Sequence, residues 1–379
     1  PNGNFVIVSP NDDEDGLTDA GTVKLVSGYT GLQIGNSIVG DDQSDQIGSG
    51  GVTALPNSNF VVVSLKDDVN GISNAGSVSL ISGTTGTQIG MTISGDNDDD
   101  ELGWGGVLAL PVSNFVVVSP LDDVNGLSDV GSVSLISDTL GTQIGVTLFG
   151  DVINDLLGSG GVAAASNNNF IIVSPEDDVN GDIDAGSIIL VDGTFGVQIG
   201  NSIIGDMDSI GPGSITVLSN NNFLVALPYY EDDFYNIRGS DTVRLVDGTT
   251  GNQIGGTIAG LSGYVVDIGG EYLTGIFYIN ALNNSNFVIG SPAWGSSSSP
   301  ADQFLTFPGA VRLFNGATGE QIGNYIQGSG NDHLGSGGVT ALPNSNFVIS
   351  SPLDDVDGII NSGSVRLING STGAQIGNA

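Results

Sequence analysis

Residues 114–149 read NFVVVSPLDDVNGLSDVGSVSLISDTLGTQIGVTLF, and seven versions of this stretch recur along the chain. The Asn-Phe pairs begin at Asn4, Asn59, Asn114, Asn169, Asn222, Asn286 and Asn346, and the Gln-Ile-Gly triplets begin at Gln33, Gln88, Gln143, Gln198, Gln253, Gln321 and Gln375. The first four spacings between these triplets are all 55 residues. A fixed period of this kind indicates one structural unit per repeat.

Each repeat contains four runs of strand length, which in the third repeat are residues 115–119, 131–137, 143–149 and 160–165. The first run is apolar, and the next two alternate apolar residues with small or polar ones at period two. Gly, Asn, Asp, Ser and Pro bound each run, as they do at turns. No stretch keeps a helical period, so we expect four short antiparallel strands per repeat.

Four-stranded units repeated four to eight times are typical of β-propellers. Seven copies therefore predict an all-β, seven-bladed β-propeller of four-stranded antiparallel blades, with residues 1–379 as a single domain. In each blade the innermost strand would be the Gly-Gly-Val run, followed by the Asn-Phe, Gly-Ser-Val and Gln-Ile-Gly strands. The alternative is a β-solenoid array, although its coils usually take about 20–30 residues.

The sequence begins just before an Asn-Phe strand and ends within a Gln-Ile-Gly strand, without an initiator Met, a signal peptide or a membrane span. We expect it to be a segment of a longer chain. An innermost strand encoded just after Ala379 would then close the ring.

The chain has 42 acidic residues, six basic residues, one His and no Cys, with a formal charge of −36. Nucleic-acid binders need basic patches, so this class is excluded. The charge also argues against docking on anionic membranes, and no membrane insertion is expected. The lack of Cys rules out disulfides and thiolate metal sites.

The acidic residues are unevenly placed. We name the connection between the Asn-Phe and Gly-Ser-Val strands the Asp-Asp loop, and the connection from the Gln-Ile-Gly strand to the next innermost strand the return loop. Successive turns of an antiparallel meander alternate between two faces, so both loops belong to one face. All but four acidic residues fall in these loops, the exceptions being Asp138, Asp192, Asp247 and Glu320. An acidic surface needed only for solvation would use both faces, so we predict one anionic rim.

Five Asp-Asp loops share a pattern of oxygen-bearing residues at i, i+1, i+3 and i+7, with Gly at i+4. Calcium is bound by six to eight oxygens in sharply turning loops, and repulsion between adjacent Asp residues favours a bound cation. The alternative is an Asx-turn, in which these oxygens accept local amide hydrogens. The predicted calcium ligands are Asp12, Asp13, Asp15 and Asp19; Asp67, Asp68, Asn70 and Asn74; Asp122, Asp123, Asn125 and Asp129; Asp177, Asp178, Asn180 and Asp184; and Asp354, Asp355, Asp357 and Asn361.

The return loops hold a second acidic set: Asp41 and Asp45, Asp96 and Asp100, and Asp151 and Asp155. These side chains can complete a neighbouring site or form a solvated rim. We expect the solvated rim.

Repeats five and six lose the regular Asp pattern and become aromatic. Exposed rings beside carboxylates and amides suit a glycan or protein ligand, whereas burial of the rings in a satellite core is the alternative. The aromatic residues lie at Tyr229, Tyr230, Phe234 and Tyr235, at Tyr264, Tyr272, Phe277 and Tyr278, and at Trp294, Phe304 and Phe307. The predicted ligand-binding residues are Tyr229, Tyr230, Tyr235 and Trp294.

Catalysis has little support. His333 is the sole His and lies in a degenerate copy of a return loop, so a general base or a Ser-His-Asp set is not indicated. Carboxylate pairs are too numerous to identify a site. We predict no catalytic residues and no enzyme.

Three stretches, Leu334–Leu342, Asn286–Pro292 and Gly309–Gly319, resemble the FG-GAP repeats of integrin-α-type propellers. The whole repeat is also similar to tandem repeats of large bacterial surface exoproteins of the filamentous-haemagglutinin kind. These resemblances imply a seven-bladed propeller, export, and adhesion or ligand binding. FG-GAP blades often bind calcium between their first two strands, where this chain has only Leu-Pro-Asn-Ser-Asn (residues 55–59), so those ligands cannot be transferred.

The expected function is therefore a secreted or cell-surface, non-enzymatic adhesion or ligand-binding propeller with a calcium-binding acidic rim and a glycan or protein partner. A structural repeat unit of a surface layer or fibre is the second hypothesis, and a polysaccharide-active enzyme is the third. The sequence leaves the oligomeric state open.

Overall fold

The structure, a computed structural model, describes residues 2–205, 210, 213–227, 242–259, 278–292 and 308–378. Two compact units divide the chain: residues 1–206 with 210–212, and residues 207–209 with 213–379. In both units the regular elements of the described residues are strands. None of the described segments is a helix long and apolar enough to cross a membrane.

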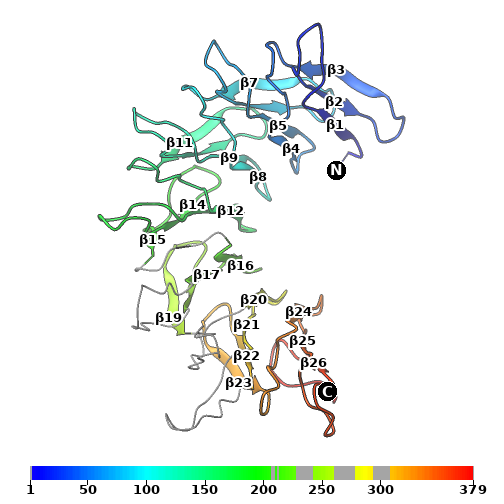
Figure 1. The fold of residues 1–379 in the computed structure, drawn as a ribbon, viewed down its shortest axis with the longest axis vertical. Helices are drawn as coiled ribbons and strands as arrows, with labels where there is room; N and C mark the ends of the chain where they lie inside the picture. Colours follow the sequence, from blue (N-terminus) through cyan, green and yellow to red (C-terminus); the bar gives the residue numbers. More distant parts are fainter. Residues whose placement is uncertain are drawn as a thin grey trace. The chain divides into compact units, whose positions relative to one another are not determined.

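The first unit contains four antiparallel sheets, each formed by strands that follow one another in the chain (Figure 1). The first sheet has three strands and the other three sheets have four. Their strands are β1 (Phe5–Ser9), β2 (Thr22–Val26) and β3 (Gln33–Val39); β4 (Gly51–Ala54), β5 (Phe60–Ser64), β6 (Ser77–Ile81) and β7 (Gln88–Ser94); β8 (Gly106–Ala109), β9 (Phe115–Ser119), β10 (Ser132–Ile136) and β11 (Gln143–Phe149); and β12 (Gly161–Ala164), β13 (Phe170–Ser174), β14 (Ser187–Val191) and β15 (Ile203–Ile204).

The second unit contains the fifth, sixth and seventh sheets, which have the same strand order. Their strands are β16 (Ile215–Val217), β17 (Phe223–Leu227), β18 (Thr242–Val246) and β19 (Gln253–Ala259); β20 (Tyr278–Ala281), β21 (Phe287–Ser291), β22 (Ala310–Phe314) and β23 (Gln321–Gln327); and β24 (Val339–Ala341), β25 (Phe347–Ser351) and β26 (Ser364–Ile368). In the seventh sheet the Gln-Ile-Gly run makes a single bridge between Ile368 and Gln375.

The predicted fold class is confirmed: the described residues are all-β and form seven antiparallel sheets with the strand order of β-propeller blades. The strands of a repeat pair with one another and run antiparallel, unlike the parallel stacking of a β-helix, so the solenoid alternative is wrong. The strands expected in the third repeat at residues 115–119 and 143–149 are β9 and β11. The single domain over residues 1–379 stays a prediction.

The hydrophobic core of each unit lies between consecutive sheets. Strands β5 and β9 are buried along their whole length, as expected for continuously apolar runs covered on both faces. Phe115 of β9 belongs to the same buried cluster as Val61 of β5 and Leu80 of β6 in the preceding sheet. The Phe residues that begin the Asn-Phe strands of sheets two to seven are at most 4 % exposed, whereas Phe5 in the first sheet is 49 % exposed.

In five of the seven sheets, the Gly of the Gln-Ile-Gly triplet lies at a β-bulge in the outermost strand. In the second sheet, the pairing of β6 with β7 shifts register between Val78 and Leu80, and Gly90 has a φ of 74°. A Cβ at Gly90 would overlap the carbonyl oxygen of Leu140 in the third sheet. The bulge therefore disrupts the free edge of the sheet and allows the next sheet to approach closely.

Asn residues before several of the Asn-Phe strands link neighbouring sheets. The Nδ2 atoms of Asn57 and Asn59 donate to the carbonyl oxygen of Asp138 in the third sheet, at 2.9 and 3.0 Å. Equivalent bonds join Asn2 and Asn4 to Gly83, and Asn284 and Asn286 to Gly370. We name this contact the Asn staple. The Asn staple explains why Asn recurs at these positions, and this explanation requires no bound ligand.

Candidate metal centre

The return loop between the first and second sheets is held at both of its ends. In the loop that leads from the first sheet to the second, the main-chain nitrogens of Gln46 and Ile47 donate to Asp19 and Ala20 of the first Asp-Asp loop, both at 3.0 Å. The nitrogen of Gly48 donates to the hydroxyl of Ser64 at the end of β5, at 3.0 Å. The loop therefore spans the junction between two consecutive sheets, and its acidic side chains lie beside the next Asp-Asp loop.

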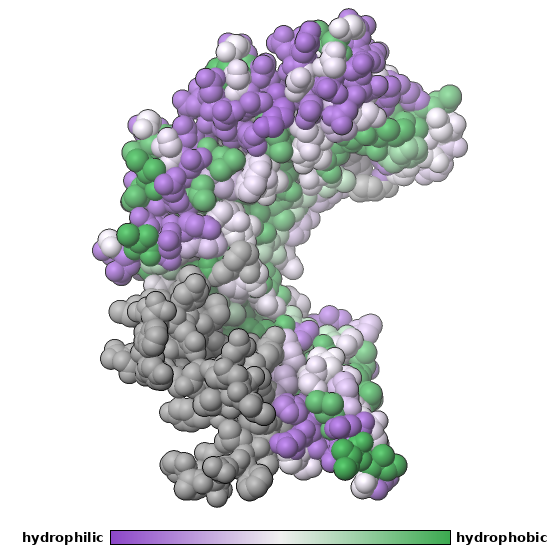
Figure 2. Space-filling model, viewed as in Figure 1, coloured by the Kyte–Doolittle hydropathy of each residue, from purple (hydrophilic) through white to green (hydrophobic). Residues whose placement is uncertain are grey.

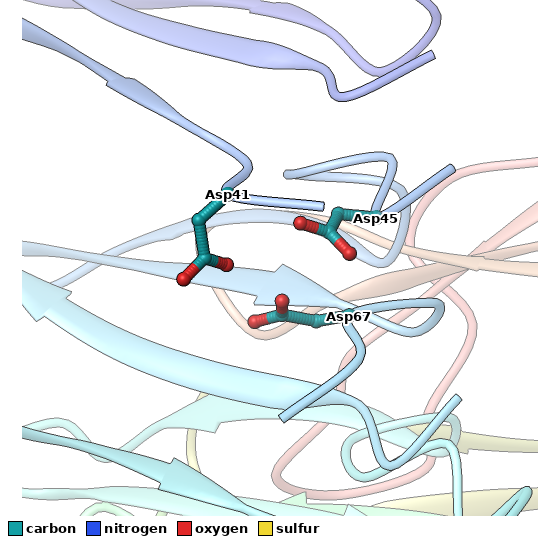
Figure 3. Close-up of side chains that lie close together, drawn as sticks. All are labelled: Asp41, Asp45 and Asp67. Atoms are coloured by element: carbon teal, nitrogen blue, oxygen red, sulfur yellow. The ribbon is translucent and has the colours of Figure 1, made fainter. Parts of the chain in front are cut away.

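Three Asp triads form at such junctions in the first unit. Each combines two acids of a return loop with the first Asp of the following Asp-Asp loop, and one carboxylate oxygen from each acid lies within 4.8 Å of the other two. In Figure 3 the carboxylates of Asp41, Asp45 and Asp67 point toward one another. The triads are Asp41, Asp45 and Asp67; Asp96, Asp100 and Asp122; and Asp151, Asp155 and Asp177.

The second return-loop acid anchors each triad. Asp45, Asp100 and Asp155 are at most 1 % exposed. The Oδ2 atom of Asp100 accepts bonds from the main-chain nitrogens of Asp96 and Asn97, at 2.8 and 2.7 Å. Its Oδ1 atom accepts a bond from the nitrogen of Asp123, at 3.1 Å. A carboxylate has about four lone-pair sites, so this oriented group keeps capacity for a further ligand.

The triads concentrate negative charge, and within the described part of the chain no salt bridge reaches them. Burial, and then the nearby carboxylates of Asp45 and Asp41, raise the pKa of Asp67 to about 6. Burial and the carboxylates of Asp100 and Asp96 likewise raise the pKa of Asp122 to about 6. Burial also raises the pKa of Asp177. Like charges held together in this way favour either a proton or a cation.

The other predicted ligands of the Asp-Asp loops have local roles. In the second sheet, Val69 and Ile72 form a bridge around Asn70 and Gly71, whose φ angles are 55° and 82°. Two consecutive positive φ values make a tight type I′ turn, which favours Asn-Gly and Asp-Gly. The same tip occurs at Asp15, Asn125, Asn180 and Asp357, each followed by Gly.

The second Asp of each loop accepts a bond from the nitrogen of the i+7 residue. The Oδ1 atom of Asp68 bonds to the nitrogen of Asn74 at 2.7 Å, and Asn74 has a φ of 50°. The same pairs are Asp13 with Asp19, Asp123 with Asp129, Asp178 with Asp184, and Asp355 with Asn361. These contacts match the Asx-turn alternative for the i+1 and i+7 positions.

The structure therefore divides the predicted ligand set. Asp67, Asp122 and Asp177 lie in the triads, while the i+1, i+3 and i+7 residues shape the loop. The expectation of a solvated rim is wrong for Asp45, Asp100 and Asp155, because the return loop folds them under the next sheet's loop. The sequence pattern that could have identified these return-loop acids as part of a site is the recurrence of Asp41 and Asp45 with the 55-residue period.

The first and last Asp-Asp loops differ from the other three. Asp12 accepts a bond from the Thr22 hydroxyl at 2.8 Å. Asp354 accepts bonds from the Ser364 hydroxyl and, at 3.0 Å, from Nη2 of Arg366. In the return loop before it, Ser329 stands where the triads have their first Asp, and its nitrogen donates to Asp332 at 2.6 Å. Burial acts to raise the pKa of Asp332, but bonds from Ser329 and the Asp355 main chain hold it below its ordinary value.

The predicted aromatic ligand site, Tyr229, Tyr230, Tyr235 and Trp294, lies outside the described residues. Tyr278 is described: it belongs to β20, it is half-buried, and its hydroxyl donates to the carbonyl oxygen of Gly335 at 3.1 Å. This ring packs against the core of the sixth and seventh sheets, and the two alternatives for the aromatic loops stay predictions. Hydrophilic residues cover much of the visible surface of the first unit, the blue-to-green part of Figure 1 (Figure 2).

Several solved structures are similar to this chain at low identity. They include a protein of unknown function from Bacteroides caccae (TM-score 0.31, 11 % identity, covering 85 % of this chain and 93 % of that chain). A complex of KlAtg21 with the coiled coil of AgAtg16 gives a TM-score of 0.39 at 10 % identity, covering 94 % and 93 %. Quinohemoprotein alcohol dehydrogenase from Comamonas testosteroni gives 0.38 at 11 %, covering 99 % and 65 %. TM-scores this low carry no argument about the chain.

No curated protein matches the sequence. A family model does match four segments, residues 1–49, 54–97, 281–324 and 341–377. They fall on the first, second, sixth and seventh repeats. The family is described as "Repeat of unknown function (DUF5650)", and these four repeats of the chain are similar to it.

Proposed function

We propose that this chain is a non-enzymatic, exported binding scaffold whose Asp triads bind calcium at the junctions between consecutive sheets. The observation that supports the proposal is the threefold recurrence of the triad, with carboxylate oxygens from two neighbouring sheets within 4.8 Å. A bound ion would connect the two sheets and neutralise charges that otherwise repel.

The chemistry of the triads suits a hard cation. All three acids in each triad offer oxygen, which calcium, magnesium and manganese prefer. Three carboxylates supply three to six ligand oxygens, so main-chain carbonyls or water would complete the six to eight that calcium takes. One acid of the three in each triad (Asp41, Asp96 or Asp151) is exposed, which fits a flexible calcium site better than the strict octahedron of magnesium.

Calcium also fits the proposed location. Extracellular modules bind calcium with dissociation constants of about 10⁻⁴–10⁻³ M, so sites assembled from loops can fill outside the cell. The resemblances to FG-GAP repeats and to large bacterial exoproteins support export and adhesion. A glycan or protein ligand on the aromatic loops of repeats five and six is the adhesive part of the proposal.

The proposed calcium binding is tested by calcium titration of the full chain. Equilibrium dialysis measures the stoichiometry, and thermal unfolding measures the stability. We expect three equivalents, a lower Tm after chelation, and recovery with calcium. The variant D45N/D100N/D155N should lose both responses. The control D192N removes an acid at the opposite end of a sheet, where Asn is native at the equivalent Asn315 and Asn369. It should keep three equivalents.

The proposed binding of a glycan or protein ligand is tested with a glycan array and the variants Tyr229→Ala and Trp294→Ala. Binding that disappears in both variants while calcium stoichiometry is retained supports a ligand-binding propeller. Normal calcium binding without a glycan or protein ligand would instead favour the structural repeat unit. Turnover of a polysaccharide that is lost on His333→Ala would contradict the non-enzymatic proposal.

A further inference from the structure

One position in each Gly-Ser-Val strand holds either a cationic or a neutral side chain. It is the middle residue of the strand and always pairs with the middle residue of the Asn-Phe strand, as in Ser79 with Val62 and Arg366 with Ile349. Along the chain the position is occupied by Lys24, Ser79, Ser134, Ile189, Arg244, Arg312 and Arg366. Four of the six basic residues of the chain therefore stand at one structural position.

At the junction of the sixth and seventh sheets this position supplies a cation to the acidic cluster. The guanidinium of Arg366 bonds to Oδ2 of Asp354 at 3.0 Å, and both side chains are largely buried, at 18 % and 5 % exposure. Asp332 of the return loop lies against Asp354. Asp332 and Asp354 are equivalent to Asp45 and Asp67 of the first triad. At the junction of the sixth and seventh sheets, the acids that correspond to a triad therefore already hold a cationic group.

The remaining triad position is changed at the same junction. The residue after the Gly that begins each return loop is Asp41, Asp96 or Asp151 in the triads, but it is Ser329 here. The hydroxyl of Ser329 donates to Oδ2 of Asp332 at 2.7 Å. Loss of one carboxylate and gain of one guanidinium therefore occur together.

The three triad junctions show the opposite combination. Each retains all three acids, and the strand position is the neutral Ser79, Ser134 or Ile189. The hydroxyl groups of Ser79 and Ser134 pair with Thr92 and Thr147, at 3.1 and 2.9 Å. Three carboxylates with a divalent ion, and two carboxylates with one guanidinium, both leave a single uncompensated negative charge.

We infer that Arg366 is a built-in cation that replaces calcium at the junction of the sixth and seventh sheets. The middle residue of the Gly-Ser-Val strand, together with the first return-loop acid, then decides whether a described junction binds a metal ion. This inference rests on the proposed calcium binding of the triads. Its consequence is that three junctions depend on calcium and the fourth described junction does not.

The inference is tested by exchanging the two arrangements in the full chain. The variant S79R/D41S copies the seventh-sheet arrangement into the first triad, and R366S/S329D copies the triad into the seventh sheet. By equilibrium dialysis we expect calcium stoichiometry to fall from three to two in the first variant and to rise from three to four in the second. In calcium-free buffer the first variant should have a higher Tm than the wild type, and the second a lower one.

The control Met91→Arg adds the same charge on β7 at a side chain that is 82 % exposed, and it should leave three equivalents. Unchanged stoichiometry in both exchange variants, with a wild type that binds three, would overturn this inference alone. A wild type that binds no calcium would overturn the proposed function and this inference with it. If S79R/D41S loses its circular dichroism spectrum, S79R alone provides the same comparison, with the same direction expected; if R366S/S329D loses it, the first exchange alone decides the inference.

Discussion

The Oδ1 atom of Asp100 accepts a hydrogen bond from the main-chain nitrogen of Asp123, 3.1 Å away. The bond ties the return loop that leaves the second sheet to the Asp-Asp loop of the third sheet. Asp45 and Asp68, and Asp155 and Asp178, are joined in the same way. In each case a main-chain nitrogen of the next sheet orients the buried carboxylate of the return loop.

Replacing Asp67 by Asn should have opposite effects with and without calcium. Without calcium at pH 7, removal of a buried charge whose pKa is raised to about 6 should stabilise the protein, by about 1–3 kcal/mol at roughly 1.4 kcal/mol per pKa unit. With calcium, the variant should lose one equivalent and gain less in Tm than the wild type. Thermal unfolding and dialysis measure both effects.

Asp68→Asn is the matched control, because an amide oxygen can still accept the bond from Asn74. It should show no such reversal. A reversal in D68N as large as that in D67N would show that Asp68 belongs to the metal site.

The pH dependence of the calcium-free protein should run opposite to ordinary acid denaturation between about pH 4 and 6. Asp67 and Asp122 have folded-state pKa values of about 6, above the ordinary value of 3.8. The folded state therefore binds more protons in this window, and the free energy of unfolding falls as the pH rises. After calcium has been removed on a chelating resin, thermal unfolding should give a higher Tm near pH 5 than at pH 7.

Saturating calcium should reverse this trend, because the ion binds deprotonated carboxylates. The Tm should then rise between about pH 5 and 7. An identical pH profile with and without calcium would mean that the triads do not hold the ion.

Phe115→Ala should destabilise the first unit strongly. Its ring is 1 % exposed and packs between the second and third sheets, and loss of a buried Phe costs about 3–5 kcal/mol. Phe5→Ala removes the same side chain at 49 % exposure and should cost much less. Urea unfolding followed by circular dichroism compares the two; equal midpoints would mean that Phe5 is covered in solution.

Asn59→Ala should weaken the Asn staple independently of calcium and pH. The variant loses the bond from Nδ2 to the carbonyl oxygen of Asp138, worth about 0.5–1.5 kcal/mol. Hydrogen exchange should show faster opening around residues 137–142, with unchanged calcium stoichiometry. Loss of calcium binding would contradict the separation of the staple from the triads.

Much of the fold follows from local sequence. The apolar run after each Asn-Phe pair can bury all of its side chains in a strand that is covered on both faces, and β5 and β9 are such strands. The Asn-Gly and Asp-Gly tips adopt the turn that their tolerance of positive φ allows. The alternation of turns in an antiparallel meander predicted that the return loops and the Asp-Asp loops share one end of the sheets, and in the first unit they meet there in the three triads.

The candidate site was only partly predictable, because its members come from separate segments. Asp41, Asp45 and Asp67 meet only after the return loop has crossed from one sheet to the next and the main chain of Asp68 has bonded to Asp45. The sequence pattern grouped Asp67 with Asp68 and Asn70, its neighbours in the chain, which instead point to local amides or form the turn.

The amino-acid sequence by itself determined the repeat, its four strands and the end of the sheets at which negative charge gathers, since these depend on periodicity and on local conformational preference. Only the tertiary structure decided which carboxylates become buried together and which junction receives a guanidinium in their place. Burial and charge compensation depend on distances between side chains of different sheets, and such distances exist only once the sheets have packed.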